Sequence, residues 1–102
     1  MLQIPLMQVP NQQLEIILNN QDCKLHLYVR GDYLYFDLDI ANEPFFYGAI
    51  CYDRTKILPV QKDSFNGNFI FIDTLSNNNP EYTKLNDRYK LYYLTNEELN
   101  EL

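Results

Sequence analysis

Residues 23–40 have the sequence CKLHLYVRGDYLYFDLDI, in which apolar and polar side chains alternate on both sides of Gly31-Asp32. Successive side chains of a β-strand point to opposite faces, so each half of this stretch has one apolar face. Glycine accepts a positive φ without steric cost, and a two-residue loop that begins with glycine suits a type II′ or I′ turn. The pattern therefore predicts a central β-hairpin over residues 23–40.

The short loop also fixes which residues of the two strands face each other. On the apolar face, the expected pairs are Val29 with Leu34, Leu27 with Phe36, Leu25 with Leu38 and Cys23 with Ile40. On the polar face, they are Arg30 with Tyr33, Tyr28 with Tyr35, His26 with Asp37 and Lys24 with Asp39. Cross-strand pairs of these kinds contribute roughly 0.2–1 kcal/mol each. A shift of one residue would expose the apolar set of one strand, so the pattern specifies this register.

Composition sets the class of protein. A chain of 102 residues suffices for one domain, residues 1–102, with a single modest core. A hydrophobic content of 46% is typical of globular proteins, and nine Tyr and six Phe favour strands. The net charge of −6 argues against nonspecific binding to a nucleic-acid backbone, which requires clustered Lys and Arg.

The rest of the chain contains short apolar segments with turn signals between them. Residues 1–12 contain two prolines, which indicate an edge strand or a strap over the core. Further strands are expected near residues 13–18, 45–52, 57–60, 69–72 and 88–94. Thr95 and Glu98 fit a capping box, which predicts a short terminal helix over residues 95–101. Seven or eight short antiparallel strands predict an all-β fold, either a small β-barrel or a β-sandwich.

Two connections carry specific turn signals. Asn42-Glu43-Pro44 is expected to form a three-residue loop, which would place Gly48 opposite Leu38. A glycine inside a strand suggests a bulge or a close backbone approach. The dipeptide Asn66-Gly67 favours a hairpin turn.

The sequence gives little support for catalysis or metal binding. The single histidine, His26, has only Asp37 across the strand as a partner. Asp37 and Asp39 share a face, but no loop of further oxygen ligands accompanies them, so no cation site is expected. Ser64 and Ser76 lie in ordinary turn contexts, and no nucleophile elbow, P-loop, dinucleotide or zinc motif is present. We therefore expect no enzyme activity and no cofactor.

Two further features concern the compartment. Cys23 and Cys51 form no CxxC pair, and we expect both to be reduced thiols in or near the core. The first ten residues lack a basic segment and are interrupted by Pro5 and Pro10. They are expected to be neither a signal peptide nor a membrane span, so the chain should stay in the cytosol where it is made.

Two sets of residues are candidates for a partner interface. Tyr28, Tyr33 and Tyr35 share the outward face of the hairpin, which is more aromatic than a solvated sheet requires. Either the N-terminal strap or a second sheet covers these rings, or they form an interface, since exposed aromatic groups favour protein contacts. Residues 74–87 are expected to be the longest loop, mobile or in contact with a partner. Its centre is Asn77-Asn78-Asn79-Pro80.

Short motifs along the chain resemble the phage baseplate plug family, small proteins of phage and prophage tails. The resemblance opens with Ile4-Pro5-Leu6 and Val9-Pro10-Asn11-Gln12. It continues through Tyr33-Leu34-Tyr35-Phe36-Asp37, Gly48 after an aromatic pair, Gly67-Asn68-Phe69, and Leu91-Tyr92-Tyr93-Leu94-Thr95 before Glu97-Glu98-Leu99. These motifs span nearly the whole chain in order.

The resemblance implies a non-enzymatic structural β-domain in the tail baseplate, near the hub and the lumen of the tail tube. Its expected partners are other tail proteins, such as hub, tube or spike, and further copies of itself, with no nucleic-acid specificity and no membrane. It would be in the host cytoplasm during assembly and then in the virion tail. The N-terminal segment and the Asn-rich loop could add a strand to a neighbour. The alternative is a soluble β-module that binds carbohydrate or peptide through its aromatic face, and an enzyme built around His26 ranks third.

Overall fold

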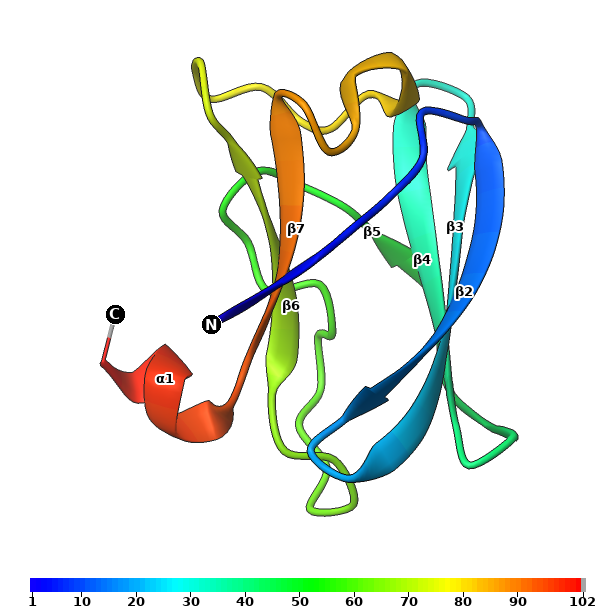
Figure 1. Cartoon of the computed structure of the whole chain (residues 1–102), viewed down its shortest axis with the longest axis vertical. Coiled ribbons are helices and arrows are strands. Elements are labelled where there is room, and N and C mark those ends of the chain that lie inside the picture. Colours follow the sequence, from blue (N-terminus) through cyan, green and yellow to red (C-terminus); the bar gives the residue numbers. More distant parts are fainter. Residues whose placement is uncertain (102) are drawn as a thin grey trace.

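Two antiparallel sheets pack face to face in the computed structural model, which describes residues 1–101 (Figure 1). The larger sheet has the order β2-β3-β4-β5, with β2 Asn11–Leu18, β3 Gln21–Arg30, β4 Tyr33–Ile40 and β5 Glu43–Ile50. The smaller sheet has the order β1-β7-β6, with β1 Leu2–Ile4, β7 Tyr89–Leu94 and β6 Asn68–Asp73. A 3-10 helix, η1 Tyr82–Lys84, and one α-helix, α1 Asn96–Asn100, complete the elements. The all-β prediction is confirmed, and the architecture is sandwich-like, with no closed barrel among the described residues.

The hairpin of β3 and β4 has the register that the alternation predicts. All eight expected pairs are present, from Arg30 with Tyr33 to Cys23 with Ile40. Gly31 has a φ of 63°, as its place in the turn requires. Val29 was expected to face the core, but the residue is 38% exposed. It lies at the last inward position before the turn, opposite the buried Leu34.

The β4–β5 connection differs from the prediction. The expected three-residue loop, residues 42–44, is wrong, because Glu43 pairs with Ile40 and Pro44 already belongs to β5. The loop is Ala41-Asn42, and φ is positive at both residues, 53° and 63°. Two consecutive residues of this kind are typical of the type I′ turn, whose twist matches the flanking strands. Alanine does not signal such a turn, and the edge strand tolerates the proline.

Gly48 lies in a bulge of β5, as the sequence suggests, but at a different register. Phe46, and not Gly48, is opposite Leu38, and the ladder is interrupted between Leu38 and Phe36. The backbone N–H of Gly48 donates to Oδ1 of Asp37 at 2.7 Å. The Asp37 side chain of β4 thus accepts a hydrogen bond from a backbone N–H that the bulge removes from the ladder between the strands.

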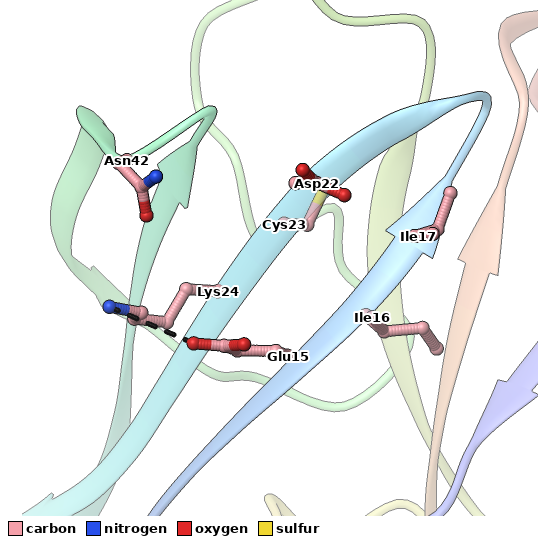
Figure 2. Close-up of a pocket in the computed structure, with 7 residues that line it drawn as sticks. All are labelled: Glu15, Ile16, Ile17, Asp22, Cys23, Lys24 and Asn42. Atoms are coloured by element: carbon pink, nitrogen blue, oxygen red, sulfur yellow. Dashed lines mark ion pairs between the residues drawn. The ribbon is translucent and has the colours of Figure 1, made fainter.

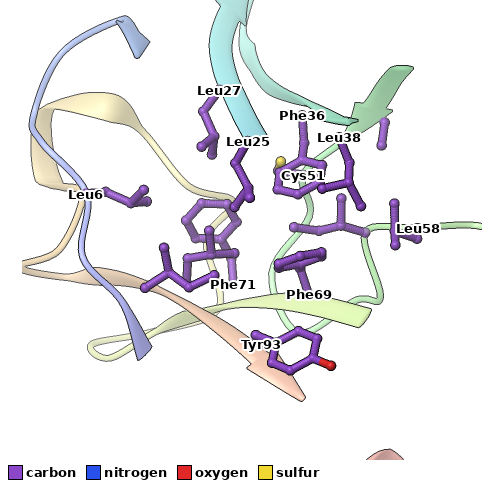
Figure 3. Packing of buried hydrophobic residues seen from close by; sticks show 14 of the residues in the cluster. Leu6, Leu25, Leu27, Phe36, Leu38, Cys51, Leu58, Phe69, Phe71 and Tyr93 are labelled. Atoms are coloured by element: carbon purple, nitrogen blue, oxygen red, sulfur yellow. The ribbon is translucent and has the colours of Figure 1, made fainter. Parts of the chain in front are cut away.

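The core lies between the two sheets (Figure 3). Leu27 and Phe36 of the hairpin are buried, and the ring of Phe36 packs against Phe69 of β6 with centroids 4.9 Å apart. Full burial of such a side chain contributes about 1.5–3 kcal/mol. Cys23 and Cys51 are free and buried, which confirms the expectation that both lie in the core.

The longest stretch between strands is residues 51–67, and not the predicted residues 74–87. It runs beside the edge of β6, where the N–H of Ile57 donates to the carbonyl of Phe69 at 2.9 Å. The expected strand at residues 57–60 is absent from the described elements, because a buried side chain replaces part of the ladder. Asn68 accepts from the N–H of Leu58 at 2.9 Å and donates to its carbonyl at 3.0 Å.

Asn66-Gly67 does not form the predicted hairpin turn, because the residues before it form no strand. Gly67 has a φ of 125° and packs against β7. A Cβ at this position would lie 2.4 Å from the carbonyl oxygen of Leu94 and 2.6 Å from the ring of Tyr93. The glycine is therefore required for close packing.

The two ends of the described chain lie on the smaller sheet (Figure 1). The N-terminal segment provides an edge strand, in which Leu2 pairs with Tyr93. It is therefore already paired and does not lie over the tyrosines. Thr95 and Glu98 form both bonds of the predicted capping box, and the Glu98 carboxylate also contacts the Met1 ammonium group. No helix within residues 1–101 is long and apolar enough to cross a membrane.

Candidate partner interface

The loop after β6 is held by a buried ion pair. Nε and Nη2 of Arg88 donate to Oδ1 and Oδ2 of Asp73 at 2.8 and 2.9 Å. The same carboxylate accepts from the backbone N–H of Leu75 and of Asn78, each at 2.9 Å. The hydrogen bonds from Arg88 hold the pKa of Asp73 well below its ordinary value. Sequence reasoning missed this pair, since charged residues beside a loop are normally interpreted as exposed to solvent.

A second arginine fixes the Asn-rich part of the loop. Nη1 of Arg54 donates to the carbonyl of Ser76 at 3.1 Å and to Oδ1 of Asn77 at 3.0 Å. Oδ1 of Asn79 accepts from the backbone N–H of Asp53 at 3.0 Å. The three asparagine side chains are exposed, while Pro80 is buried. The loop thus presents polar groups on a backbone that specific hydrogen bonds hold in place.

Tyr28 and Tyr35 lie together on the outward face of the larger sheet. Their rings stack with centroids 6.0 Å apart, and the Tyr28 hydroxyl donates to Oδ1 of Asp37 at 3.0 Å. Partial burial and this hydrogen bond raise the pKa of Tyr28. The second sheet packs on the opposite face, and the N-terminal segment pairs with β7. The alternative in which one of them covers the tyrosines is therefore wrong.

The polar residues around these rings are occupied by one another. His26 contacts Oδ1 of Asn11 at 2.9 Å and Oδ2 of Asp37 at 3.6 Å. The hydroxyl of Tyr47 donates to Asp39. Within residues 1–101, no group of three or more His, Cys, Asp or Glu side chains is placed to hold a metal ion. The contacts of His26, Asp37 and Asp39 are therefore with residues of the same outward face.

Tyr33 is separate from the other two tyrosines. It lies next to the turn and contacts Tyr52 edge to face, with centroids 5.8 Å apart. Tyr33 and Tyr52 are 39% and 40% exposed. The structure thus divides the seven expected interface residues into a stacked pair on the sheet, three exposed asparagines followed by the buried Pro80, and Tyr33 at the end of the sandwich.

Tyr33 and Pro80 both line a groove of about 450 Å³ between the β3–β4 turn and η1. The side chains and backbone that line it are those of Val29, Gly31, Asp32, Tyr33, Leu34, Pro80, Glu81, Tyr82 and Thr83. We call this the turn groove. Sequence reasoning placed Val29 in the core and gave no role to residues 81–83. The only sign in the sequence that Val29 is exposed was its position near the end of its strand.

A second groove, of about 380 Å³, lies at the other end of β3 beside β2 (Figure 2). Nζ of Lys24 lies 4.0 Å from Oε1 of Glu15 across it, so charges of both signs line this groove. Burial raises the pKa of the Cys23 thiol, which favours the protonated and unreactive form. With Asp22, the lining of this groove has two acidic residues and one lysine, and it offers no activated nucleophile.

Comparisons with known proteins give one family. The family model described as "Cyanophage baseplate Pam3 plug gp18" matches residues 1–97, which include all seven strands and the turn groove. A search of curated proteins finds no match. The resemblance to phage baseplate plug proteins in the short sequence motifs is confirmed. The chain belongs to the cyanophage baseplate Pam3 plug gp18 family.

Proposed function

We propose that this chain is a non-enzymatic structural protein that helps to close the tail tube of a phage or prophage, near the hub of the baseplate. The observation that carries the proposal is the family match over residues 1–97. The polar side chains of the sheet support it, since His26, Asp37 and Asp39 bind neighbouring residues of the same chain. Its partners are other tail proteins of the hub, tube or spike.

Two physical properties suit this role. A net charge of −6 disfavours adhesion to the DNA that passes through a tail tube. The loops at the end of the sandwich are ordered by internal hydrogen bonds, from Arg88 to Asp73 and from Arg54 to Asn77. A surface that is ordered before binding loses less conformational entropy on assembly. The chain is therefore suited to fixed contacts in a rigid particle.

The test is the composition of purified tails. Tails from an induced lysogen or an infected culture would be purified on a density gradient and quantified by mass spectrometry. We expect this chain at a constant ratio to the hub protein across the gradient, while an abundant host cytosolic protein serves as the control for carry-over. Deletion of the gene should give particles that lack the chain and leak DNA or do not assemble. Absence of the chain from wild-type tails would rule out the proposal.

A further inference from the structure

We propose that the turn groove binds a segment of a neighbouring baseplate protein in which a Lys or Arg lies next to an apolar side chain. The proposal rests on the baseplate role, and it names the chemistry of the partner at one surface. It uses three observations, which are the exposed apolar walls, the sign of the charges that line the groove, and the order of its backbone.

The apolar walls come from two distant parts of the chain. Val29 and Tyr33 are 38% and 39% exposed, although both lie beside the buried Leu34. Tyr82, half-buried in η1, lines the opposite wall. Tyrosine is enriched in protein interfaces, and apolar side chains that remain exposed in a concave site gain free energy when a partner removes them from water. These walls fit an apolar side chain of the partner.

The charges in the turn groove have one sign. Asp32 and Glu81 are its charged lining residues, and both are exposed. No Lys or Arg of the described chain lines the groove. Arg30 is adjacent in sequence, but its guanidinium lies over the ring of Tyr35 on the outward face, 5.9 Å from the centroid. A cationic group of the partner is therefore the complement of this rim.

The turn groove is built on ordered backbone. The N–H of Val29 donates to the carbonyl of Pro10 at 3.0 Å, and the N–H of Leu85 donates to the carbonyl of Tyr82 at 3.3 Å. The Tyr89 hydroxyl donates to Oε2 of Glu81 at 3.3 Å, which positions that carboxylate. The groove is therefore present before a partner binds, as is usual for binding sites.

Charge reversal at Asp32 tests the sign of the partner. A phage that lacks the gene would be complemented with wild-type chain, Asp32→Lys, Asp32→Asn or Asp63→Lys. The Asp32 carboxylate has no hydrogen-bond partner within residues 1–101, so its substitution should leave the fold intact. Asp63 is the matched control. It lies at the opposite end of the sandwich, next to Ser64, whose carbonyl accepts from Gln21 at 2.8 Å.

We expect Asp32→Lys to reduce the amount of chain in purified tails by about tenfold or more, because like charges across an interface are strongly unfavourable. Asp32→Asn should give a smaller reduction, and Asp63→Lys should equal wild type. Thermal melting of each purified variant checks that the fold is retained. Wild-type levels of Asp32→Lys in tails would overturn the proposal. If the wild-type chain is itself absent from tails, the baseplate role fails instead.

A photo-crosslinker identifies the segment. Tyr33 would be replaced by p-benzoylphenylalanine, tails would be assembled and irradiated, and the crosslinked peptide would be sequenced. We expect a peptide of another tail protein with Lys or Arg within two residues of an aliphatic or aromatic side chain. An acidic peptide, a second copy of this chain, or no crosslink in tails that contain the chain would each overturn the proposal.

Discussion

The guanidinium of Arg88 donates one hydrogen bond to each carboxylate oxygen of Asp73, at 2.8 and 2.9 Å. The Asp73 side chain is fully buried, and that of Arg88 is largely so. This pair joins the start of β7 to the end of β6 and to the loop that follows it. A paired charge in the interior depends on its partner, because removal of one group leaves the other without compensation.

Asp73→Asn should lower the stability of the whole domain. The amide cannot accept both bonds from Arg88, and it leaves a cation in a site with little access to water. We expect the urea midpoint of unfolding to fall by more than for any other single carboxylate-to-amide variant. Asp63→Asn, an exposed control, should keep the wild-type midpoint. Equal midpoints for the two variants would show that the pair contributes nothing.

The pH dependence of stability should contain a contribution from the same residue. Hydrogen bonds from Arg88 lower the pKa of folded Asp73 below its ordinary 3.8, so below about pH 4 the unfolded chain binds more protons than the folded one. The contribution is therefore complete above about pH 5 and is lost as the pH falls through the lower folded pKa. Urea unfolding at several pH values should show wild type and Asp73→Asn converging towards acid. Parallel curves would contradict the assignment.

Gly67→Ala should be more damaging than Gly31→Ala. Both glycines have positive φ, but a Cβ at Gly31 meets nothing within 4 Å, whereas at Gly67 it overlaps Leu94 and Tyr93. An alanine in the left-handed conformation of Gly31 costs about 1–2 kcal/mol. At Gly67 the backbone costs about 1–3 kcal/mol, and the overlap adds to it. Chemical denaturation of the two variants measures the difference, and an equal loss would argue against the close packing.

Asn68→Ala should detach the 51–67 connection from β6. The buried amide of Asn68 forms hydrogen bonds with the N–H and the carbonyl of Leu58. It also accepts from the backbone N–H of Phe69 at 2.8 Å. The loss of these hydrogen bonds should lower the free energy of unfolding by about 2–3 kcal/mol. Asn78→Ala, at an exposed position, should change it by less than about 0.5 kcal/mol. Hydrogen exchange at the Leu58 amide should accelerate only in Asn68→Ala, and unchanged exchange there would contradict the bond.

Both cysteines should resist thiol reagents in the folded protein. Burial raises the pKa of the Cys51 thiol far above its ordinary value and also raises that of Cys23. Since the thiolate is the reactive form, Ellman's reagent should react with neither thiol in native buffer and with both in urea. Rapid reaction without denaturant would show that one of them reaches the surface.

The hairpin of β3 and β4 could be predicted pair by pair, because its alternation and its two-residue loop are local and agree with each other. The terminal capping box could be predicted for the same reason. The β4–β5 turn could not, since Ala41 adopts a left-handed conformation that its side chain does not favour. The hairpin turn predicted at Asn66-Gly67 was wrong for a related reason. Its glycine is needed for contact with β7, which lies far along the sequence.

The candidate interface was predicted only in outline. Tyr33 and Pro80 were expected, but the sequence cannot place them in one groove, because the extent of each sheet over the other depends on packing between distant strands. Val29 follows the inward pattern and is nevertheless 38% exposed, although its cross-strand partner Leu34 is buried. The anchors of the loop, Asp73 and Arg88, are ordinary charges in sequence and become a pair only in the folded chain.

The pairing of β1 with β7 sets the order in which a nascent chain can fold. The meander of β2 to β5 joins neighbours along the chain and needs only tight turns, so it can form while synthesis continues. Leu2, which is made before the meander, pairs with Tyr93, which is made after it. The smaller sheet therefore closes only after β7 has left the ribosome, and until then the inner face of the meander is exposed to other unfinished chains.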